Sequence, residues 1–133
     1  MEGIRDRQVC ISHNLAEAVA PILTCSQPCA VFCVSDNIAR ELYQIVKKAG
    51  RRIPDDVSVV GAGNLDFGEL LAPPLTSIDQ HPFEIGTQAV TLIFKRLQEK
   101  VSADAGPLHV SVKGRLVPRD SVRRLSAAGK TAR

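Results

Sequence analysis

A chain of 133 residues is long enough for one domain with a modest core, and its 44% hydrophobic and 23% charged residues are typical of a globular protein. Residues 119–133 hold five of the 17 basic residues and one of the 14 acidic ones, which leaves a net charge of −1 on residues 1–118. The positive charge therefore gathers in a tail, and the body lacks the ordered basic surface that nucleic-acid binding requires.

Targeting signals are missing from the sequence. Residues 2–7 are charged and lack the apolar core of a secretory signal. No run approaches the roughly 18 apolar residues of a membrane span. We therefore expect a cytoplasmic protein without membrane contact.

The first elements expected along the chain are a short strand at residues 8–11 and a helix after it. Asn14, with Glu17 three residues later, forms a capping pair that predicts a helix to about Leu23. Pro21 lies inside this helix and should kink or shorten it.

A central strand and a second helix are expected next. Residues 28–34 predict the strand, because residues 30–34 would be apolar on both faces, as in a sheet covered by helices on both sides. Ser35 and Asp36 are helix-cap residues, and an apolar stripe at three- and four-residue spacing predicts a helix to residue 49. Gly50 is its natural stop.

Two more strands and a long helix follow. Residues 57–61 predict a buried strand, and the loop after it contains a helical turn near residues 67–71. A short strand is expected at residues 76–79. Pro82, a favoured first-turn residue, begins an amphipathic helix to about residue 100.

The chain then returns through two short strands, at residues 109–112 and 116–117. The β-α-β-α order, with crossovers of this length, predicts an α/β fold with a doubly wound parallel sheet.

The sequence shows no residue pattern typical of a catalytic site, so we expect neither an enzyme nor a bound cofactor. Cys25, Cys29 and Cys33 are spaced by four, which is not a zinc spacing, and no metal site is predicted. The three histidines lack partners at useful spacing. Gly61-Ala62-Gly63 is not followed by the third glycine and helix of a dinucleotide-binding loop.

Four ordered blocks resemble the regulatory domain of the LacI/GalR class of bacterial transcription regulators. They are Ala30-Val31-Phe32-Cys33-Val34-Ser35-Asp36, the run from Ala49 to Gly61, Pro73-Pro74-Leu75-Thr76-Ser77-Ile78-Asp79-Gln80, and Leu116-Val117-Pro118-Arg119-Asp120-Ser121. The resemblance implies a periplasmic-binding-protein-like (type I) fold, in which two lobes close on a small effector. A separate helix-turn-helix, which this sequence does not show, would bind the operator DNA.

The resemblance also implies how the chain is divided. Residues 1–80 would form the second, C-terminal lobe, and residues 81–107 the crossover and a helix of a largely absent first lobe. Residues 108–122 would return to the second lobe, and residues 123–133 would be a disordered basic tail.

By the same resemblance, the effector contacts would be Ser35, Gly63, Asn64 and Gln80. The loop at residues 62–64 departs from the aromatic-Asp-Asp sequence common in the family, which removes strong acceptors for sugar hydroxyls. A structural alternative stays open: Ser35 would cap its helix, Asn64 would adopt a left-handed turn, and Gln80 would satisfy backbone groups.

Two functions share this fold. The main prediction is the effector-binding and dimerisation portion of a regulator that responds to a small, sugar-like ligand. The alternative is a periplasmic-type solute-binding protein of a transport system. A half-domain leaves apolar surface open, so we also expect a homodimer that covers either the stripe of helix 82–100 or the face of helix 36–49 on which Tyr43 would point away from the core.

Overall fold

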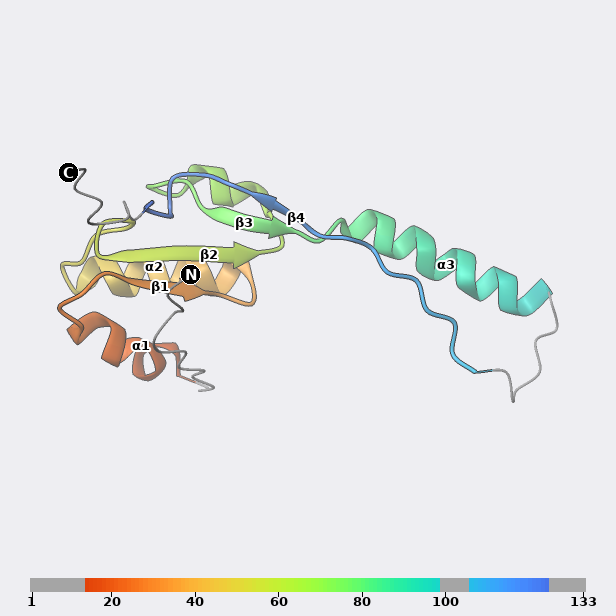
Figure 1. The fold of residues 1–133 in the computed structure, drawn as a ribbon, viewed down its shortest axis with the longest axis horizontal. Coiled ribbons are helices and arrows are strands. Elements are labelled where there is room, and N and C mark those ends of the chain that lie inside the picture. Colours follow the sequence, from red (N-terminus) through yellow and green to blue (C-terminus); the bar gives the residue numbers. More distant parts are fainter. Residues whose placement is uncertain (1–13, 99–105, 125–133) are drawn as a thin grey trace, which may run out of the picture.

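The computed structural model describes residues 14–98 and 106–124, in which four strands form one mixed sheet in the order β1-β2-β3-β4 (Figure 1). β1 (Cys29–Phe32), β2 (Val57–Ala62) and β3 (Thr76–Asp79) run parallel, and β4 (Arg115–Val117) pairs antiparallel with β3. The α/β fold class predicted from the sequence is therefore confirmed, with an antiparallel strand at one edge.

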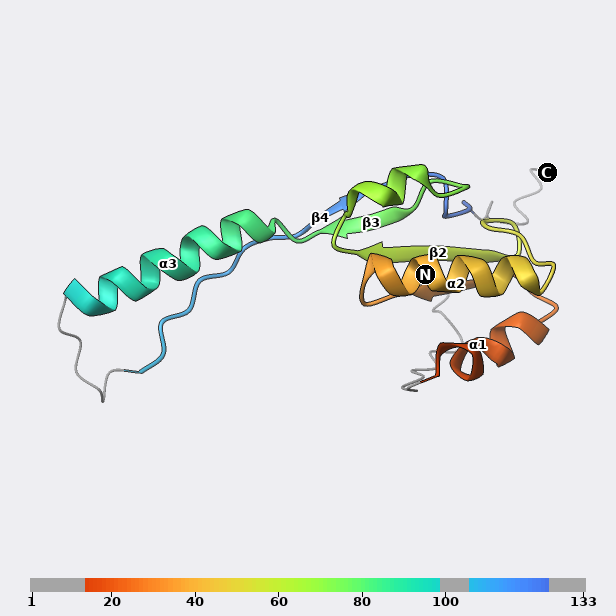
Figure 2. The same ribbon diagram turned by 180° about the vertical axis from the view of Figure 1, so that it is seen from behind.

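Two helices cover one face of the sheet. α1 (Leu15–Thr24) and α2 (Asp36–Lys48) pack against each other, and α2 lies behind the sheet in Figure 1 and in front of it in Figure 2. The apolar core lies between these helices and the strands, and its buried members are Val19, Cys33, Ala39, Leu42, Tyr43, Val46, Val57, Val59 and Leu75.

Local sequence determines where these helices begin and end. The Asn14 side chain accepts a hydrogen bond from the N–H two residues on (3.1 Å) and donates to Glu17 (3.0 Å), so the predicted cap of α1 is confirmed. The Ser35 side chain caps α2 by accepting from the Ile38 N–H at 3.3 Å. After α2, Gly50 has φ +69°, a left-handed conformation that glycine adopts without strain.

The strand predicted at residues 28–34 is found as β1, but its predicted central position is not seen among the described strands. Within the described residues β1 is an edge strand, and its side chains alternate between the packed face and an open one. Phe32 on the open face is 59% exposed, and Val34 just beyond the strand is 73% exposed. A run that is apolar throughout does not reveal whether one or both faces are covered.

Two further expectations are also wrong. Tyr43 lies in the core at 6% exposure, where its hydroxyl donates to the Pro73 carbonyl at 3.0 Å, so it does not point outward. Residues 109–112 form no strand, since only residues 115–117 find a partner in β3. The strand expected at residues 8–11 and most of the basic tail, residues 125–133, lie outside the described residues.

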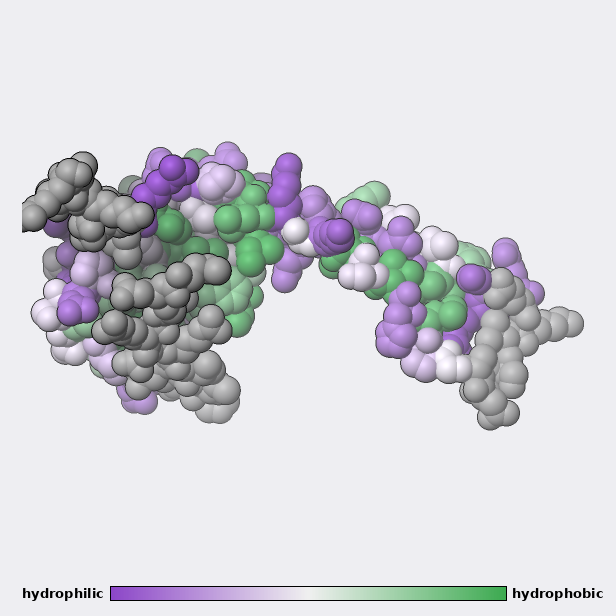
Figure 3. Space-filling view, viewed as in Figure 1, coloured by the Kyte–Doolittle hydropathy of each residue, from purple (hydrophilic) through white to green (hydrophobic). Residues whose placement is uncertain are grey.

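The long helix α3 (Pro82–Gln98) stands apart from the sheet (Figures 1 and 2). None of its residues is buried, and hydrophobic side chains lie at its surface in Figure 3. The returning segment runs back from residue 106 to β4. Across residues 14–98 and 106–124, no helix combines the length and apolar content needed to cross a bilayer.

Candidate effector site

The carboxyl ends of three parallel strands meet at one edge of the sheet. Ser35 begins α2 shortly after β1, Gly63 and Asn64 follow β2 directly, and Gln80 follows β3 directly. The four residues predicted to contact an effector therefore lie at the same edge. In open α/β sheets this edge is where small ligands bind.

The loop after β2 is held in a fixed conformation. Gly63 has φ +120° and its N–H donates to the Ile78 carbonyl at 2.8 Å. Asn64 has φ +50°, and its N–H donates to the Ser77 hydroxyl at 3.1 Å. The structure thus shows the left-handed turn at Asn64 that the sequence left open.

The Asp36 side chain connects this loop to the sheet through hydrogen bonds. Its side chain is fully buried; one carboxylate oxygen accepts from the Ser77 hydroxyl at 2.6 Å and the other from the Leu65 N–H at 2.7 Å. A methyl group on Gly61 would lie 2.1 Å from the Asp36 Oδ1, so only glycine fits there. Ser35 alone is the helix cap, and Asp36 joins the start of α2 to the loop and to β3.

Arg119 holds the same loop from the opposite side. Its side chain, 13% exposed, donates to the Leu75 carbonyl (2.8 Å), the Asn64 side-chain oxygen (2.9 Å) and the Glu69 carboxylate (2.8 Å). This role of Arg119 was not predicted from the sequence, although the Arg-Asp-Ser ending after the last strand was a usable signal.

Ser121 attaches the segment after β4, which also carries Arg119, to the sheet. Its buried hydroxyl accepts from the Thr76 N–H at 2.8 Å and donates to the Val59 carbonyl at 2.6 Å. The segment that carries Arg119 therefore bridges β2 and β3.

A tight turn places Gln80 at the crossover. The Asp79 carboxylate accepts from the His81 N–H at 2.9 Å, and His81 has φ +52°. That hydrogen bond is the main cause of the lowered pKa of Asp79; the charges of His81 and Arg115 and a hydrogen bond from the Asn64 side chain act in the same direction. The Gln80 side chain is exposed, whereas the Asn64 side-chain oxygen already accepts a hydrogen bond from Arg119.

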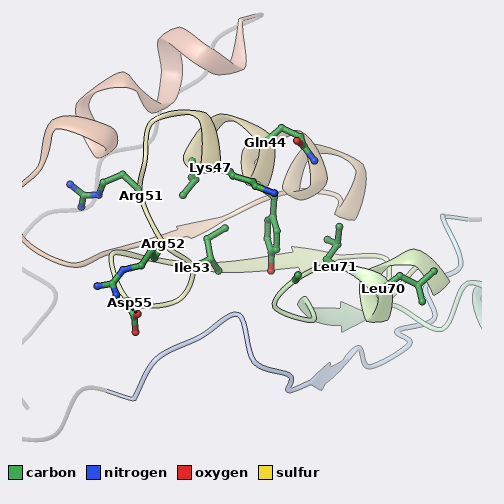
Figure 4. A pocket seen from close by; sticks show the side chains of 11 residues that line it. Gln44, Lys47, Arg51, Arg52, Ile53, Asp55, Leu70 and Leu71 are labelled. Atoms are coloured by element: carbon green, nitrogen blue, oxygen red, sulfur yellow. Dashed lines mark ion pairs between the residues drawn. The ribbon is translucent and has the colours of Figure 1, made fainter.

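The opposite edge of the sheet carries a separate pocket of about 510 Å³ (Figure 4). It lies between the second half of α2 and the segments that enter β2 and β3. Its lining includes Lys47, Arg52, Ile53, Leu70 and Leu71. This pocket is remote from the carboxyl ends of the strands and is not part of the candidate effector site.

In the described part of the chain, no group of three His, Cys, Asp or Glu side chains is arranged to hold a metal ion. Cys25, Cys29 and Cys33 are free thiols. The four predicted contact residues offer hydroxyl, amide and backbone groups, which can form hydrogen bonds with a polar molecule.

Three parallel strands with a polar, structurally fixed loop at their carboxyl ends form the kind of edge at which open α/β sheets bind small molecules. Residues 2–122 match the periplasmic binding protein-like domain, and the chain belongs to this family.

The curated relatives are repressors. The chain is 36% identical over 103 residues to the HTH-type transcriptional repressor PurR of Pasteurella multocida, a match that covers 75% of this chain and 29% of the repressor. It is 41% identical over 73 residues to the ribose operon repressor of Haemophilus influenzae, covering 55% of this chain and 22% of that protein. The chain thus spans less than a third of the length of these relatives.

A solved LacI family regulator from Enterococcus faecalis, with bound ribose, superimposes with a TM-score of 0.72 at 31% identity, covering 84% of this chain and 40% of that one. The resemblance to the LacI/GalR class is confirmed, and the chain matches part of the periplasmic-binding-protein-like domain of such regulators. The relatives are transcriptional repressors rather than transport proteins, which favours the main functional prediction over the solute-binding alternative.

Proposed function

We propose that this chain supplies the second lobe of a cytoplasmic regulator that binds a small hydroxylated ligand and controls transcription through operator DNA. The observation that carries the proposal is the convergence of Ser35, Gly63, Asn64 and Gln80 at the carboxyl ends of three parallel strands. Ribose is the first ligand to test, because it is bound to the Enterococcus faecalis regulator and the Haemophilus influenzae relative is a ribose operon repressor.

Within this proposal the four residues contribute in different ways. Gln80 has an exposed amide that can both donate to and accept from a ligand hydroxyl. Gly63 and Asn64 shape the loop, since the Asn64 side-chain oxygen is already engaged by Arg119. Ser35 keeps its hydroxyl proton for a ligand while its oxygen caps α2.

The first lobe would complete the site. We assign residues 14–80 and 108–122 to the second lobe and α3, with the crossover before it, to the first. α3 has exposed Phe83 (89%), Ile93 and Leu97, which a first lobe would cover. Ligand binding between the lobes would favour one lobe arrangement, and that shift in population would change the affinity for operator DNA.

The ligand contact is tested by calorimetric titration of ribose into the whole regulator. Gln80→Ala should weaken binding about tenfold, through the loss of hydrogen bonds to the ligand. Gln27→Ala, at an exposed glutamine in the turn before β1 and so away from the carboxyl ends of the strands, is the matched control and should bind like the unmodified protein. Equal affinity in the two variants would remove Gln80 from the site.

We further propose that the regulator is a homodimer that pairs through α2 and the neighbouring Leu70, which is 85% exposed. In the whole protein the α3 stripe would be covered by the first lobe, which leaves the α2 surface for a second copy. Sedimentation velocity should then show a dimer that Leu70→Glu converts to a monomer. A well-folded monomer at high concentration without any substitution would contradict the proposal.

A further inference from the structure

Two half-buried cysteines lie together where α1 ends and β1 begins. Cys25 is the residue directly after α1, and Cys29 is the first residue of β1. The Cys25 N–H and the Cys29 thiol both donate to the Ile22 carbonyl, at 3.4 and 3.7 Å, so both cysteines surround one oxygen atom. Cys25 also lies close enough to Cys29 to help raise the pKa of the Cys29 thiol.

A basic side chain stabilises this junction. Arg51, in the loop after α2, donates to the Cys25 carbonyl at 2.8 Å and to the Leu23 carbonyl at 3.4 Å. In Figure 4 its side chain points away from the remote pocket, toward the segment that joins α1 and β1. The guanidinium group therefore fixes the segment that carries Cys25 and places a positive charge near the Cys29 sulphur.

We propose that Cys25 and Cys29 form a redox-active dithiol that closes to an intramolecular disulfide by exchange with a low-molecular-weight disulfide such as oxidised glutathione. The bond would close the five-residue segment from Cys25 to Cys29. Since the Cys25 N–H and the Cys29 thiol share the Ile22 carbonyl as acceptor, the two side chains lie close enough for rotation to bring the sulphur atoms to an S–S bond length of about 2.05 Å.

Oxidised glutathione is the oxidant in this reaction, and two molecules of reduced glutathione are its other product. The Cys25 thiolate attacks one sulphur of glutathione disulfide, which forms a mixed disulfide and releases one glutathione. The Cys29 thiolate then attacks the Cys25 sulphur and releases the second glutathione. The two cysteines lose two electrons, the glutathione disulfide gains them, and the two cysteine protons pass to the departing thiols.

The surroundings of Cys29 predict when closure is fast. Burial is the main cause that raises the pKa of Cys29; the neighbouring Cys25 adds to this, while the charge of Arg51 opposes it. Closure should therefore accelerate as the pH rises above neutrality, because more Cys29 becomes thiolate. Disulfides in a reducing compartment are usually transient, so the pair would act as a sensor rather than as a permanent link.

Cys33 provides a matched control in the same part of the fold. It lies just beyond β1 and is 4% exposed, and burial raises the pKa of its thiol to about 11. It should therefore stay reduced under conditions that oxidise the pair. Cys10 lies outside the described residues, and a Cys10→Ser background removes it as an alternative partner.

The test incubates the full chain with glutathione buffers of increasing oxidised fraction, followed by acid quenching, alkylation and peptide mass spectrometry. The expected result is the loss of two free thiols, with Cys25 and Cys29 linked within one chain. This loss should persist in Cys10→Ser and Cys33→Ser. In Cys25→Ser and in Cys29→Ser the remaining thiol should carry glutathione instead. The proposal is overturned if both thiols remain alkylatable at the most oxidising ratio, or if a linkage to Cys10 or Cys33 forms in their place.

Discussion

Asp36 is the residue whose removal should most disturb the candidate site. Its carboxylate accepts two short hydrogen bonds, from the Ser77 hydroxyl and the Leu65 N–H, and its side chain is fully buried. Asp36→Ala leaves both donors without a partner in a site that water does not reach. A hydrogen bond to a charged group contributes about 1.5–3 kcal/mol, so the variant should lose about 3–5 kcal/mol of unfolding free energy.

That loss is large compared with the total stability of about 5–15 kcal/mol that is usual for a domain. With a urea m-value of about 2 kcal/mol per molar, the unfolding midpoint should fall by about 2 M. Urea denaturation followed by far-UV circular dichroism measures this shift directly. Hydrogen exchange should accelerate in the loop after β2 but not in α1, which has no contact with the carboxylate.

Ser77→Ala is the milder companion variant, in case Asp36→Ala does not fold. It removes one of the two bonds to Asp36 together with the acceptor of the Asn64 N–H, and should cost about 1.5–3 kcal/mol. A double-mutant cycle of the two substitutions should give a coupling energy of about 1–2 kcal/mol, since the residues share one bond. If Asp36→Ala folds and loses less than about 1 kcal/mol, or if the two losses are additive, the assignment of Asp36 as the fastening point of the loop is wrong.

Three other substitutions test the neighbouring contacts. Gly61→Ala would place a methyl group 2.1 Å from the Asp36 Oδ1 and should cost about 1–3 kcal/mol of unfolding free energy in urea denaturation; unchanged stability would mean that Asp36 moves freely. Arg119→Lys keeps the charge but loses the forked guanidinium group that reaches both the Leu75 carbonyl and Asn64, so it should cost about 1–3 kcal/mol of unfolding free energy. Glu69→Gln, at the exposed end of the ion pair, should cost less than about 1 kcal/mol. Equal losses in the two variants would contradict this ranking. The folded-state pKa of Asp79 is lowered below 3.8, so its stabilising contribution is present above that pH and is lost as the pH falls through the folded-state value. The stability difference between the unmodified chain and Asp79→Asn should therefore shrink as the pH falls below about 4 in denaturant titrations, and a difference that stays constant from pH 6 to pH 3 would contradict the assignment.

Local signals account for the parts of the fold that the sequence predicted well. Ser35 supplies a side-chain cap and Gly50 a left-handed stop, so the limits of α2 follow from residues within a few positions of each end. The strand at residues 76–79 and the start of α3 at Pro82 were likewise found where expected. Each of these features depends on the backbone preferences of adjacent residues.

The incorrect predictions concern contacts between distant parts of the chain. The outward position expected for Tyr43 failed because its ring fills the core while its hydroxyl reaches Pro73, 30 residues away. The role of Arg119 depends on Asn64, which is 55 residues away. Periodicity shows which side chains prefer an apolar environment, but it does not show which neighbour provides that environment. The same reason explains why the apolar run of β1 did not reveal its open face.

The two networks around the loop also bear on how the whole receptor would work. Asp36 and Ser77 hold residues 63–65 from one side, and Arg119 holds them from the other, entirely with groups of this lobe. A loop that is already fixed loses little conformational freedom when a ligand binds, so little of the binding free energy is needed to order the loop. More of it is then available for ligand affinity and for lobe closure. The first lobe would then add contacts to an edge that is already shaped. On this argument, substitutions in the two networks should weaken ligand binding even though Asp36, Ser77 and Arg119 need not contact the ligand.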